Sequence, residues 1–186
     1  MDDHREINGS ANPDKRLPSG FSLCGRVLTL TVGLPASGKT TFAENAGVDF
    51  TISLDDCRET LWGDRAIQDG RGGINALLAL QDALILEAMK ENKSIIVHNT
   101  SILKKYRTPL LELARNKGYH TQIVYFDMPV EKCIRRNQQR RDAVPREAME
   151  DFAAKLEVPA ADEADRVVTA SMLDETLVKN PCEAPP

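Results

Sequence analysis

The sequence predicts an α/β protein with a parallel β-sheet covered by helices on both faces. Apolar strand-like runs alternate with helix-like stretches, which is the pattern of βαβ units. With 186 residues, 41% of them hydrophobic, the chain can bury one sizeable core without subdividing. We therefore expect one domain over residues 23–174, between polar, flexible tails at 1–22 and 175–186.

The elements follow from residue type and apolar spacing. Short apolar runs, most of them rich in β-branched residues, are the expected strands: Val27–Val32, Phe50–Ser53, Ser94–His98, Thr121–Phe126 and Arg166–Thr169. Stretches with apolar residues at a period near 3.6 are the expected helices: Lys39–Ala46, Asp56–Trp62, Ile74–Asn92, Lys104–Lys117, Val130–Arg140 and Arg146–Lys155.

A phosphate-binding loop joins the first expected strand to the first expected helix. The stretch "GLPASGKTT" matches G-x-x-x-x-G-K-[ST], in the strand-to-helix position that this motif requires. Backbone N–H groups of such a loop surround a phosphate, the lysine reaches the β- and γ-phosphates, and the hydroxyl after it holds Mg²⁺. We expect the nucleotide to contact Gly33, Leu34, Pro35, Ala36, Ser37, Gly38, Lys39, Thr40 and Thr41, with Mg²⁺ on Thr40.

Acidic residues follow the second expected strand, where ligands of open α/β sheets bind. A carboxylate there can take the proton of an attacking hydroxyl during phosphoryl transfer, and Asp55 is the candidate, with Asp56 as its rival. Arg58 comes one helical turn after Asp55 and could hold a phosphate of the acceptor. The alternative interpretation makes one aspartate a helix cap and Arg58 a solvated surface charge.

The stretch "RRNQQRR" concentrates arginines in residues 135–141 of a chain whose net charge is −4. On a continuous helix Arg136 and Arg140 would share one face and could close over phosphates as a lid. Val144 and Pro145 then interrupt the helix, as a hinge would. The alternative is a solvated, charged helix face.

Together, "GLPASGKTT", "SLDDCRETLWG", "IIVHNTSILKKYR" and "CIRRNQQRRDAVP" resemble the P-loop kinases of the polynucleotide 5′-hydroxyl kinase type over residues 28–159. "LEVPAADEADRVV" is similar to the close of that family's domain. The resemblance implies a P-loop NTPase-type sheet with an Arg-rich helical lid, and ATP with Mg²⁺ as cofactors. It also implies roles for Lys39 and Thr40 on ATP and Mg²⁺, Asp55 as general base, Arg58 on the acceptor phosphate, Thr100 in the acceptor site and Arg140 as the essential lid arginine.

The chain departs from the family's pattern after the third expected strand. The family usually carries an acid there, whereas this sequence has His98 and Asn99. Such an acid would help to organise Mg²⁺ through water, so its replacement affects the expected surroundings of the metal. His98 is either a polar contact of the acceptor site or hydrogen-bonded structure.

We therefore expect an ATP-dependent kinase that phosphorylates a hydroxyl on a nucleic acid, DNA or RNA. Three alternatives stay open: a phage-type kinase of a hydroxymethylated base such as 5-hydroxymethyluracil in DNA, a small-molecule or nucleoside kinase, and a P-loop ATPase that transfers nothing. Nothing in the sequence indicates the oligomeric state.

Net charge, cysteine spacing and the apolar runs limit the binding partners and the cellular location that the sequence predicts. A pI of about 5.5 excludes nucleic-acid binding by overall charge, so any polynucleotide contact comes from a local patch. The cysteines are widely spaced, at positions 24, 57, 133 and 182, and we expect reduced thiols. The chain shows no secretory leader and no apolar run of the ~18 residues that a membrane span requires. These features predict a cytoplasmic protein without a membrane segment.

Overall fold

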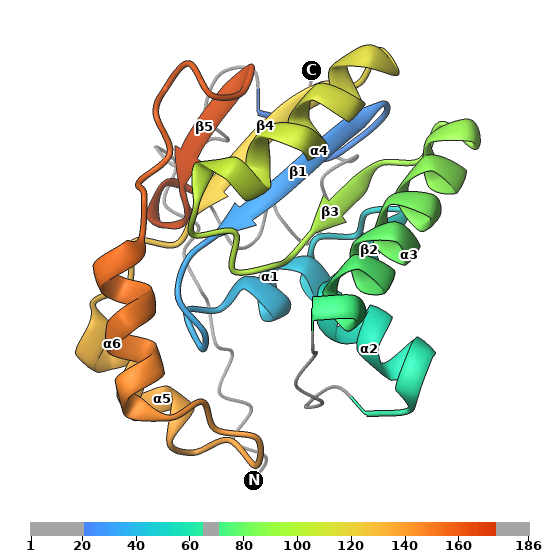
Figure 1. Cartoon of the computed structure of the whole chain (residues 1–186). Coiled ribbons are helices and arrows are strands. Elements are labelled where there is room, and N and C mark those ends of the chain that lie inside the picture. Colours follow the sequence, from blue (N-terminus) through green and yellow to red (C-terminus); the bar gives the residue numbers. More distant parts are fainter. Residues whose placement is uncertain (1–20, 65–70, 174–186) are drawn as a thin grey trace, which may run out of the picture.

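The computed structural model describes residues 21–64 and 71–173, so the expected tails lie almost wholly outside the described part of the chain. Within it, parallel strands form a sheet in the order β2-β3-β1-β4-β5 (Figure 1). The strands are β1 (Val27–Val32), β2 (Phe50–Ile52), β3 (Ile95–Val97), β4 (His120–Tyr125) and β5 (Arg166–Thr169). The predicted parallel sheet is confirmed, with strand ends shifted by a residue.

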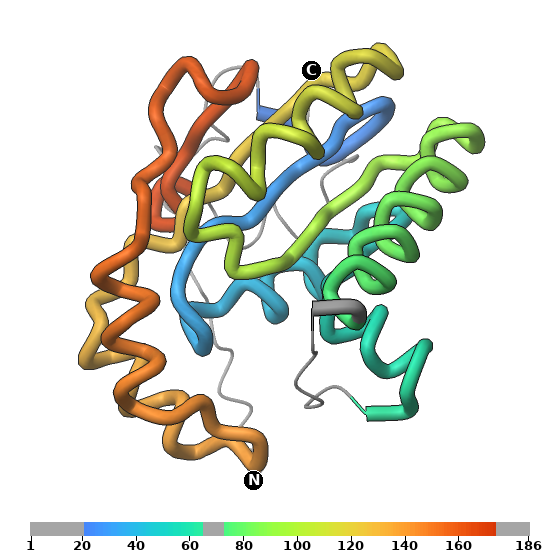
Figure 2. The backbone as a smooth tube through the Cα atoms, viewed as in Figure 1, coloured from blue at the N-terminus to red at the C-terminus, as the bar shows by residue number. Residues whose placement is uncertain are grey.

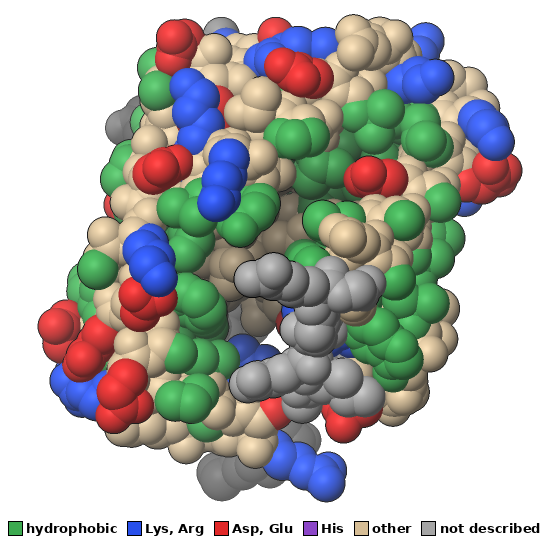
Figure 3. Space-filling model, in the orientation of Figure 1, with side chains coloured by type: hydrophobic (Ala, Val, Ile, Leu, Met, Phe, Trp, Pro, Cys, Tyr) green, Lys and Arg blue, Asp and Glu red, His purple; other side chains and the backbone are tan. Residues whose placement is uncertain are grey.

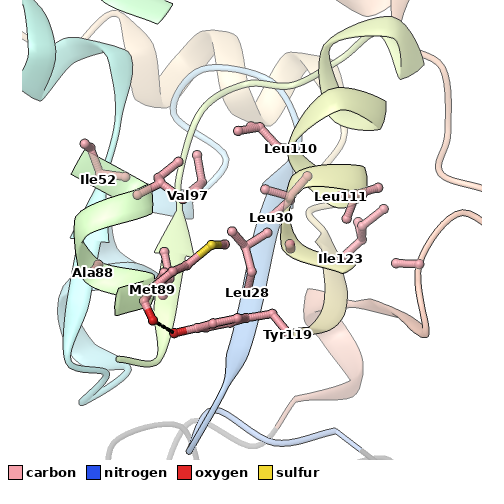
Figure 4. Close-up of a cluster of buried hydrophobic side chains, with 14 of the residues drawn as sticks. Leu28, Leu30, Ile52, Ala88, Met89, Val97, Leu110, Leu111, Tyr119 and Ile123 are labelled. Carbon is pink, nitrogen blue, oxygen red and sulfur yellow. Dashed lines mark hydrogen bonds between the residues drawn. The ribbon is translucent and has the colours of Figure 1, made fainter. Parts of the chain in front are cut away.

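Helices cover both faces of the sheet, as predicted. Alternate strand residues such as Leu28 and Leu30 point to one face, where they pack against α3 (Arg71–Lys90) and α4 (Lys104–Asn116). Figure 4 shows Leu28 and Leu30 between Met89 of α3 and Leu111 of α4. Period-2 alternation in the strands and period-3.6 spacing in the helices thus meet in one core.

The opposite face is covered by α1 (Lys39–Asn45) and by chain that flanks the sheet. Ile96 and Val124 face this side, where Phe21 and Leu23 pack with them. Phe21 falls within the expected N-terminal tail, yet only 6% of it is exposed. The packed structure therefore begins before the expected boundary at residue 23.

A helical hairpin of α5 (Val130–Asn137) and α6 (Arg146–Lys155) forms the lid, which we define as residues 130–156. It extends from the sheet edge in Figures 1 and 2. It has its own buried cluster of Cys133, Ile134 and Met149, joined by Leu34 of the phosphate loop. The expected lid is confirmed as a helical unit, and a leucine seats it on the loop.

The cysteines differ from the expectation in one respect. Cys57 and Cys133 are free and buried, but Cys24 takes part in a disulfide bond, so the prediction of reduced thiols is wrong for Cys24. Spacing along the sequence does not reveal which sulfurs approach one another in space. In the part of the chain that the structure describes, no helix has the length and apolarity to cross a bilayer.

The sheet order places the phosphate loop at its centre. The chain leaves β1, forms β2 at one edge and returns through β3 beside β1 before β4 forms on the other side. Because all the strands are parallel, their carboxyl ends and the loops after them meet at one edge. Ligands bind at such a topological switch point in open α/β sheets.

Candidate active site

The phosphate loop needs glycine at both ends. Gly33 has φ 153°, and a Cβ there would lie 2.9 Å from Cβ of Phe126 and 3.0 Å from its carbonyl oxygen. Gly38 has φ 109° immediately before α1. Glycine alone adopts such conformations without steric cost. The glycines of the sequence motif therefore fix the backbone shape of the loop.

Lys39 is folded back onto the loop. Its Nζ donates hydrogen bonds to the carbonyl of Leu34 at 2.6 Å and to Oγ of Ser37 at 3.4 Å. Burial is the main cause that lowers the pKa of Lys39 to about 8; the positive charge of Arg140 acts in the same direction, and the charges of Cys133 and Asp55 oppose it. The lysine is held at the base of the loop, where phosphate oxygens would compete for its protons.

A cavity of about 1580 Å³ opens above the loop and brings most of the predicted site residues together. Figure 3 shows the molecular surface hollowed between the lid side and the α2–α3 side. The cavity is lined by every predicted loop residue from Pro35 to Thr41, by Asp55, Arg58 and Thr100, and by Arg136 and Arg140 of the lid. Gly33 and Leu34 are outside this lining, because Gly33 turns against Phe126 and Leu34 is buried in the lid cluster.

Asp56 caps the helix that carries Asp55. Ser53 precedes α2 (Leu54–Trp62) and forms a capping box with Asp56: the Ser53 N–H and Oγ both donate to Oδ2 of Asp56 at 2.7 Å. Burial alone would raise the pKa of Asp56, but hydrogen bonds from His98 and Ser53 outweigh it and lower the pKa to about 2. The geometry assigns Asp56 to structure, which leaves Asp55 as the candidate base.

Asp55 lies in the first turn of α2 and lines the cavity. Its Oδ1 accepts a hydrogen bond from Nη1 of Arg58 at 2.6 Å, with 57% of the Asp55 side chain and 20% of the Arg58 side chain exposed. The carboxylate and the guanidinium share one rim of the cavity, opposite the lid. This placement is the one that the one-turn spacing predicted.

His98 and Asn99 build the support under α2. Nε2 of His98 lies 3.5 Å from Oδ2 of Asp56, and Oδ1 of Asn99 accepts the Leu54 N–H at 2.8 Å. The Asn99 amide in turn donates to the buried Gln81 at 3.2 Å. Of the two interpretations of His98, its contacts favour hydrogen-bonded structure, although the residue also borders the cavity.

The segment after β3, residues 98–103, is called the acceptor loop here because it contains Thr100. The Thr100 carbonyl accepts the Gly33 N–H at 3.0 Å, which ties this segment to the phosphate loop. Oγ1 of Thr31 donates to the Asn99 carbonyl at 3.2 Å. Thr100 is therefore held next to the phosphate loop and lines the same cavity as Asp55 and Arg58.

Arg136 and Arg140 of the lid both line the cavity, but they do not lie on one helix as predicted. Helix α5 ends at Asn137, whose side chain pairs with the backbone N–H and carbonyl of Val144 and closes the intervening loop. Arg140 therefore lies in a turn, and the predicted i,i+4 pair with Arg136 on one helix is wrong. Both guanidinium groups still line the cavity; Arg140 lies 3.3 Å from Asp142.

Sequence reasoning assigned no role to Arg107, Glu157 or Glu163. Arg107 and Glu163 form a buried ion pair, with 1% and 4% of their side chains exposed. Glu157 and Glu163 fall inside the quoted "LEVPAADEADRVV", so the signal was present. Their partner could not be found, because Arg107 lies some fifty residues earlier in the chain.

The donors around Thr40 fit a Mg²⁺ ion that arrives with a nucleotide. Mg²⁺ keeps several waters and takes one or two protein oxygens plus phosphates. Thr40 and the carboxylate of Asp55 line the same cavity, which supplies such oxygens. Within the described residues no cluster of three acidic, His or Cys side chains could hold a metal by itself. These oxygens would complement the phosphate oxygens of a bound nucleotide around the ion.

Fold and cavity together define the class of protein. A parallel sheet with β1 at its centre, a glycine-bounded phosphate loop that leads into α1, and a lid with arginines over the loop make up a P-loop kinase-like α/β fold. Residues 28–159 match the family model described as the AAA domain, and the chain belongs to this family.

Individual relatives agree on the fold and differ in their reported substrates. The chain is 25% identical over 143 residues to an L-seryl-tRNA(Sec) kinase of Methanococcus maripaludis, a match to 72% of this chain and 53% of the relative. The chain thus spans about half the length of this curated relative. It is also similar to a structure of the Pnkp1/Rnl/Hen1 RNA repair complex, with TM-score 0.61, 21% identity, and coverage of 71% of this chain and 44% of that one.

A third relative binds small molecules. The structure of the Mycobacterium tuberculosis APS kinase CysC in complex with AMPPNP and APS has TM-score 0.58 and 19% identity, and the match covers 83% of this chain and 94% of that one. At these identities the solved structures establish the common fold alone. The acceptor must be argued from the cavity.

Proposed function

We propose that the protein is an ATP-dependent kinase that transfers the γ-phosphate to a hydroxyl group of a nucleic acid. The observation that carries the proposal is the position of Asp55 and Arg58 on the rim of the cavity that the phosphate loop lines from below. A carboxylate and a guanidinium at this rim would suit an acceptor hydroxyl and its neighbouring phosphate, beside the loop that would hold the donor.

The donor side consists of the phosphate loop and the lid. Lys39 and the loop N–H groups would hold the β- and γ-phosphates, and Arg136 and Arg140 would close over them. Bound Mg²⁺, held by Thr40 together with the phosphates, would neutralise negative charge during transfer. Ala170, Ser171 and Leu173 line the cavity beyond the loop, in a position suited to the nucleoside.

The acceptor side consists of Asp55, Arg58 and Thr100. The acceptor oxygen forms the new bond to the γ-phosphorus, the bond from that phosphorus to the β–γ bridging oxygen breaks, ADP leaves, and Asp55 takes the hydroxyl proton. Arg58 would grip an acceptor phosphate with its planar guanidinium. Such a contact, made by the guanidinium that here pairs with Asp55, would favour a nucleotide over a neutral sugar or nucleoside.

Similarity supports a nucleic-acid acceptor. The curated relative is a tRNA kinase, and one structural relative belongs to an RNA repair complex. DNA, including a hydroxymethylated base, remains an acceptor within the same proposal. An ATP-dependent reaction is consistent with the predicted cytoplasmic location. A disulfide bond such as the one that Cys24 forms is uncommon in cytosolic proteins.

A small-molecule kinase is the second candidate. The acidic overall charge and the similarity to an APS kinase favour it. It predicts phosphorylation of a free sugar, nucleoside or nucleotide with no increase in efficiency for longer substrates.

The deciding experiment measures label transfer from γ-labelled ATP to a panel of acceptors: 5′-hydroxyl DNA, 5′-hydroxyl RNA, hydroxymethyl-base DNA, free nucleosides and sugars. We expect label on a polynucleotide. Label on nucleosides or sugars alone would refute the proposed acceptor class. Labelling of nothing, combined with steady ATP hydrolysis, would identify the protein as an ATPase.

A further inference from the structure

Arg107 on α4 is buried, and its guanidinium makes several hydrogen bonds behind the acceptor loop. Its Nε and Nη2 form a two-pronged pair with the carboxylate of Glu163, the second bond at 3.1 Å. Its Nη1 donates to the Ser101 carbonyl at 2.8 Å and to the Glu157 carbonyl at 3.1 Å. One guanidinium therefore joins the loop that precedes α4 to the segment 157–163, which lies 50 to 56 residues further along the chain.

The first joined segment is the acceptor loop. Ser101 follows Thr100 directly and has φ 46°, a left-handed conformation that costs a non-glycine residue free energy. The hydrogen bond from Arg107 fixes the carbonyl of this strained residue. On the other side of Ser101, the Thr100 carbonyl is fixed by Gly33 of the phosphate loop. Gly33 and Arg107 therefore hold two successive carbonyls, those of Thr100 and Ser101.

The second joined segment is the point where the chain leaves the lid. Glu157 follows the lid, and its N–H donates to the Ile102 carbonyl at 2.8 Å. The Glu157 carboxylate accepts the Lys104 N–H at 2.5 Å, and its carbonyl accepts from Arg107. The end of the lid is thus attached to the acceptor loop and to the start of α4 by several hydrogen bonds.

We propose that Arg107 is a positioning residue that makes the acceptor loop and the base of the lid move as one unit, so that closure of the lid over a nucleotide also sets Thr100 in place for the acceptor. Arg107 is buried and does not line the cavity, so it would touch neither substrate. It acts through Ser101 and Glu157, and Glu163 holds its guanidinium in the required orientation. A lysine could neutralise Glu163, but it lacks the planar guanidinium that bonds the Glu163 carboxylate and the carbonyls of Ser101 and Glu157 at the same time.

The test compares matched pairs of variants. Arg107→Met/Glu163→Gln removes the ion pair without leaving an unpaired buried charge, which preserves the fold better than either single change. Arg107→Lys keeps the positive charge but loses the two parallel hydrogen bonds from Nε and Nη2 to the Glu163 carboxylate. Arg146→Met/Glu150→Gln is the control, because it removes an exposed Arg–Glu pair of the lid with the same changes in charge.

The main measurement is amide hydrogen exchange with and without AMPPNP and Mg²⁺, on peptides that cover residues 98–103 and 138–145. In the wild type and the control we expect the nucleotide to protect both segments. In Arg107→Met/Glu163→Gln we expect protection of 138–145 alone, and in Arg107→Lys a reduced effect on 98–103. Protection of 98–103 in the double variant equal to that in the wild type would overturn the proposal, as would no response of 98–103 in the wild type.

A kinetic measurement gives a second criterion with whichever acceptor the panel identifies. We expect KM for the acceptor to rise about tenfold in the double variant while KM for ATP changes less than twofold, a coupling within the usual range. Equal changes in both constants would indicate general loosening and contradict the proposal. The inference rests on the proposed kinase activity, but the exchange measurement needs no acceptor. If the nucleotide protects 98–103 together with 138–145 while no acceptor is labelled, the proposed function is refuted and the coupling through Arg107 stands. If the double variant does not fold, Arg107→Lys decides by the same two criteria.

Discussion

The donor and acceptor sides of the cavity are built in different ways. The donor side consists of one contiguous loop and a helical hairpin seated on it through Leu34 and an apolar cluster. The acceptor side consists of short segments that follow β2 and β3 and are held by a polar network of Asp56, His98, Asn99 and Arg107. An apolar contact tolerates sliding, whereas each buried hydrogen bond fixes one geometry. The acceptor side is therefore expected to be the more rigid and the more sensitive to single changes.

The largest expected effect is that of replacing Asp55, whose role we distinguish from that of the adjacent Asp56. Asp55→Ala removes the candidate base, and we expect kcat to fall about 10²- to 10⁴-fold with ATP affinity and thermal stability unchanged. Steady-state kinetics, ATP titration and thermal unfolding test this. Near wild-type label transfer by Asp55→Ala would remove Asp55 as the base. Lys39→Ala serves as the inactive control.

A change in the apolar contact tests the donor side. Leu34→Ala leaves a void in the lid cluster, and we expect a loss of about 2–4 kcal/mol of lid packing, seen as faster amide exchange across residues 130–156 and weaker ATP binding. KM for the acceptor should change less than KM for ATP. The reverse order would contradict the division into two differently built sides.

The pH dependence of nucleotide binding reports on Lys39. Because the pKa of Lys39 is lowered to about 8, the free protein loses this positive charge as the pH rises through 8. Phosphate binding then requires proton uptake, so we expect ATP affinity to fall by about tenfold per pH unit above that value. Calorimetric titrations between pH 7 and 9.5 measure this. In Lys39→Met the affinity should be weak and independent of pH over this range; a parallel decline would assign the effect to another group.

The smallest expected effect belongs to the cap. Asp56→Ala removes the capping box of α2, and we expect the free energy of unfolding to fall by about 1–2 kcal/mol. The pKa of Asp56 is lowered to about 2, so its contribution is present above pH 4 and lost as the pH falls through 2. Denaturant unfolding of wild type and Asp56→Ala at pH 7 and pH 2.5 tests this. Equal differences in stability at the two pH values would contradict the assigned role.

Features built from contiguous residues could be predicted from the sequence, whereas features that depend on partners in space could not. Lys39, Thr40 and the glycines of the phosphate loop are contiguous, and each has a fixed role in a strand-to-helix turn, so their places followed from the pattern. The helix end at Asn137 did not, because the Asn137 side chain bonds the backbone of Val144 and stops the helix, and this pairing cannot be read from the polar residues 138–142. The choice between Asp55 and Asp56 likewise needed the partner of each carboxylate in space.

The buried network under the acceptor side was beyond prediction for a related reason. Arg107 pairs with Glu163, and Asn99 bonds both Leu54 and Gln81. Each partner lies many residues away, and periodicity carries no information about such pairs. His98, Asn99 and Thr100 stand out in the sequence and "LEVPAADEADRVV" matches a family pattern, but the roles of Glu157 and Glu163 depend on the tertiary fold.

The seat of the lid on Leu34 has a consequence for synthesis of the chain. Leu34 emerges from the ribosome early, whereas its partners Cys133, Ile134 and Met149 emerge only when most of the domain has been made. A nascent chain that carries the phosphate loop alone therefore lacks the apolar contact that holds Leu34, whose carbonyl accepts from Lys39. The apolar contact between the phosphate loop and the lid is thus one of the last parts of the domain that can form during synthesis.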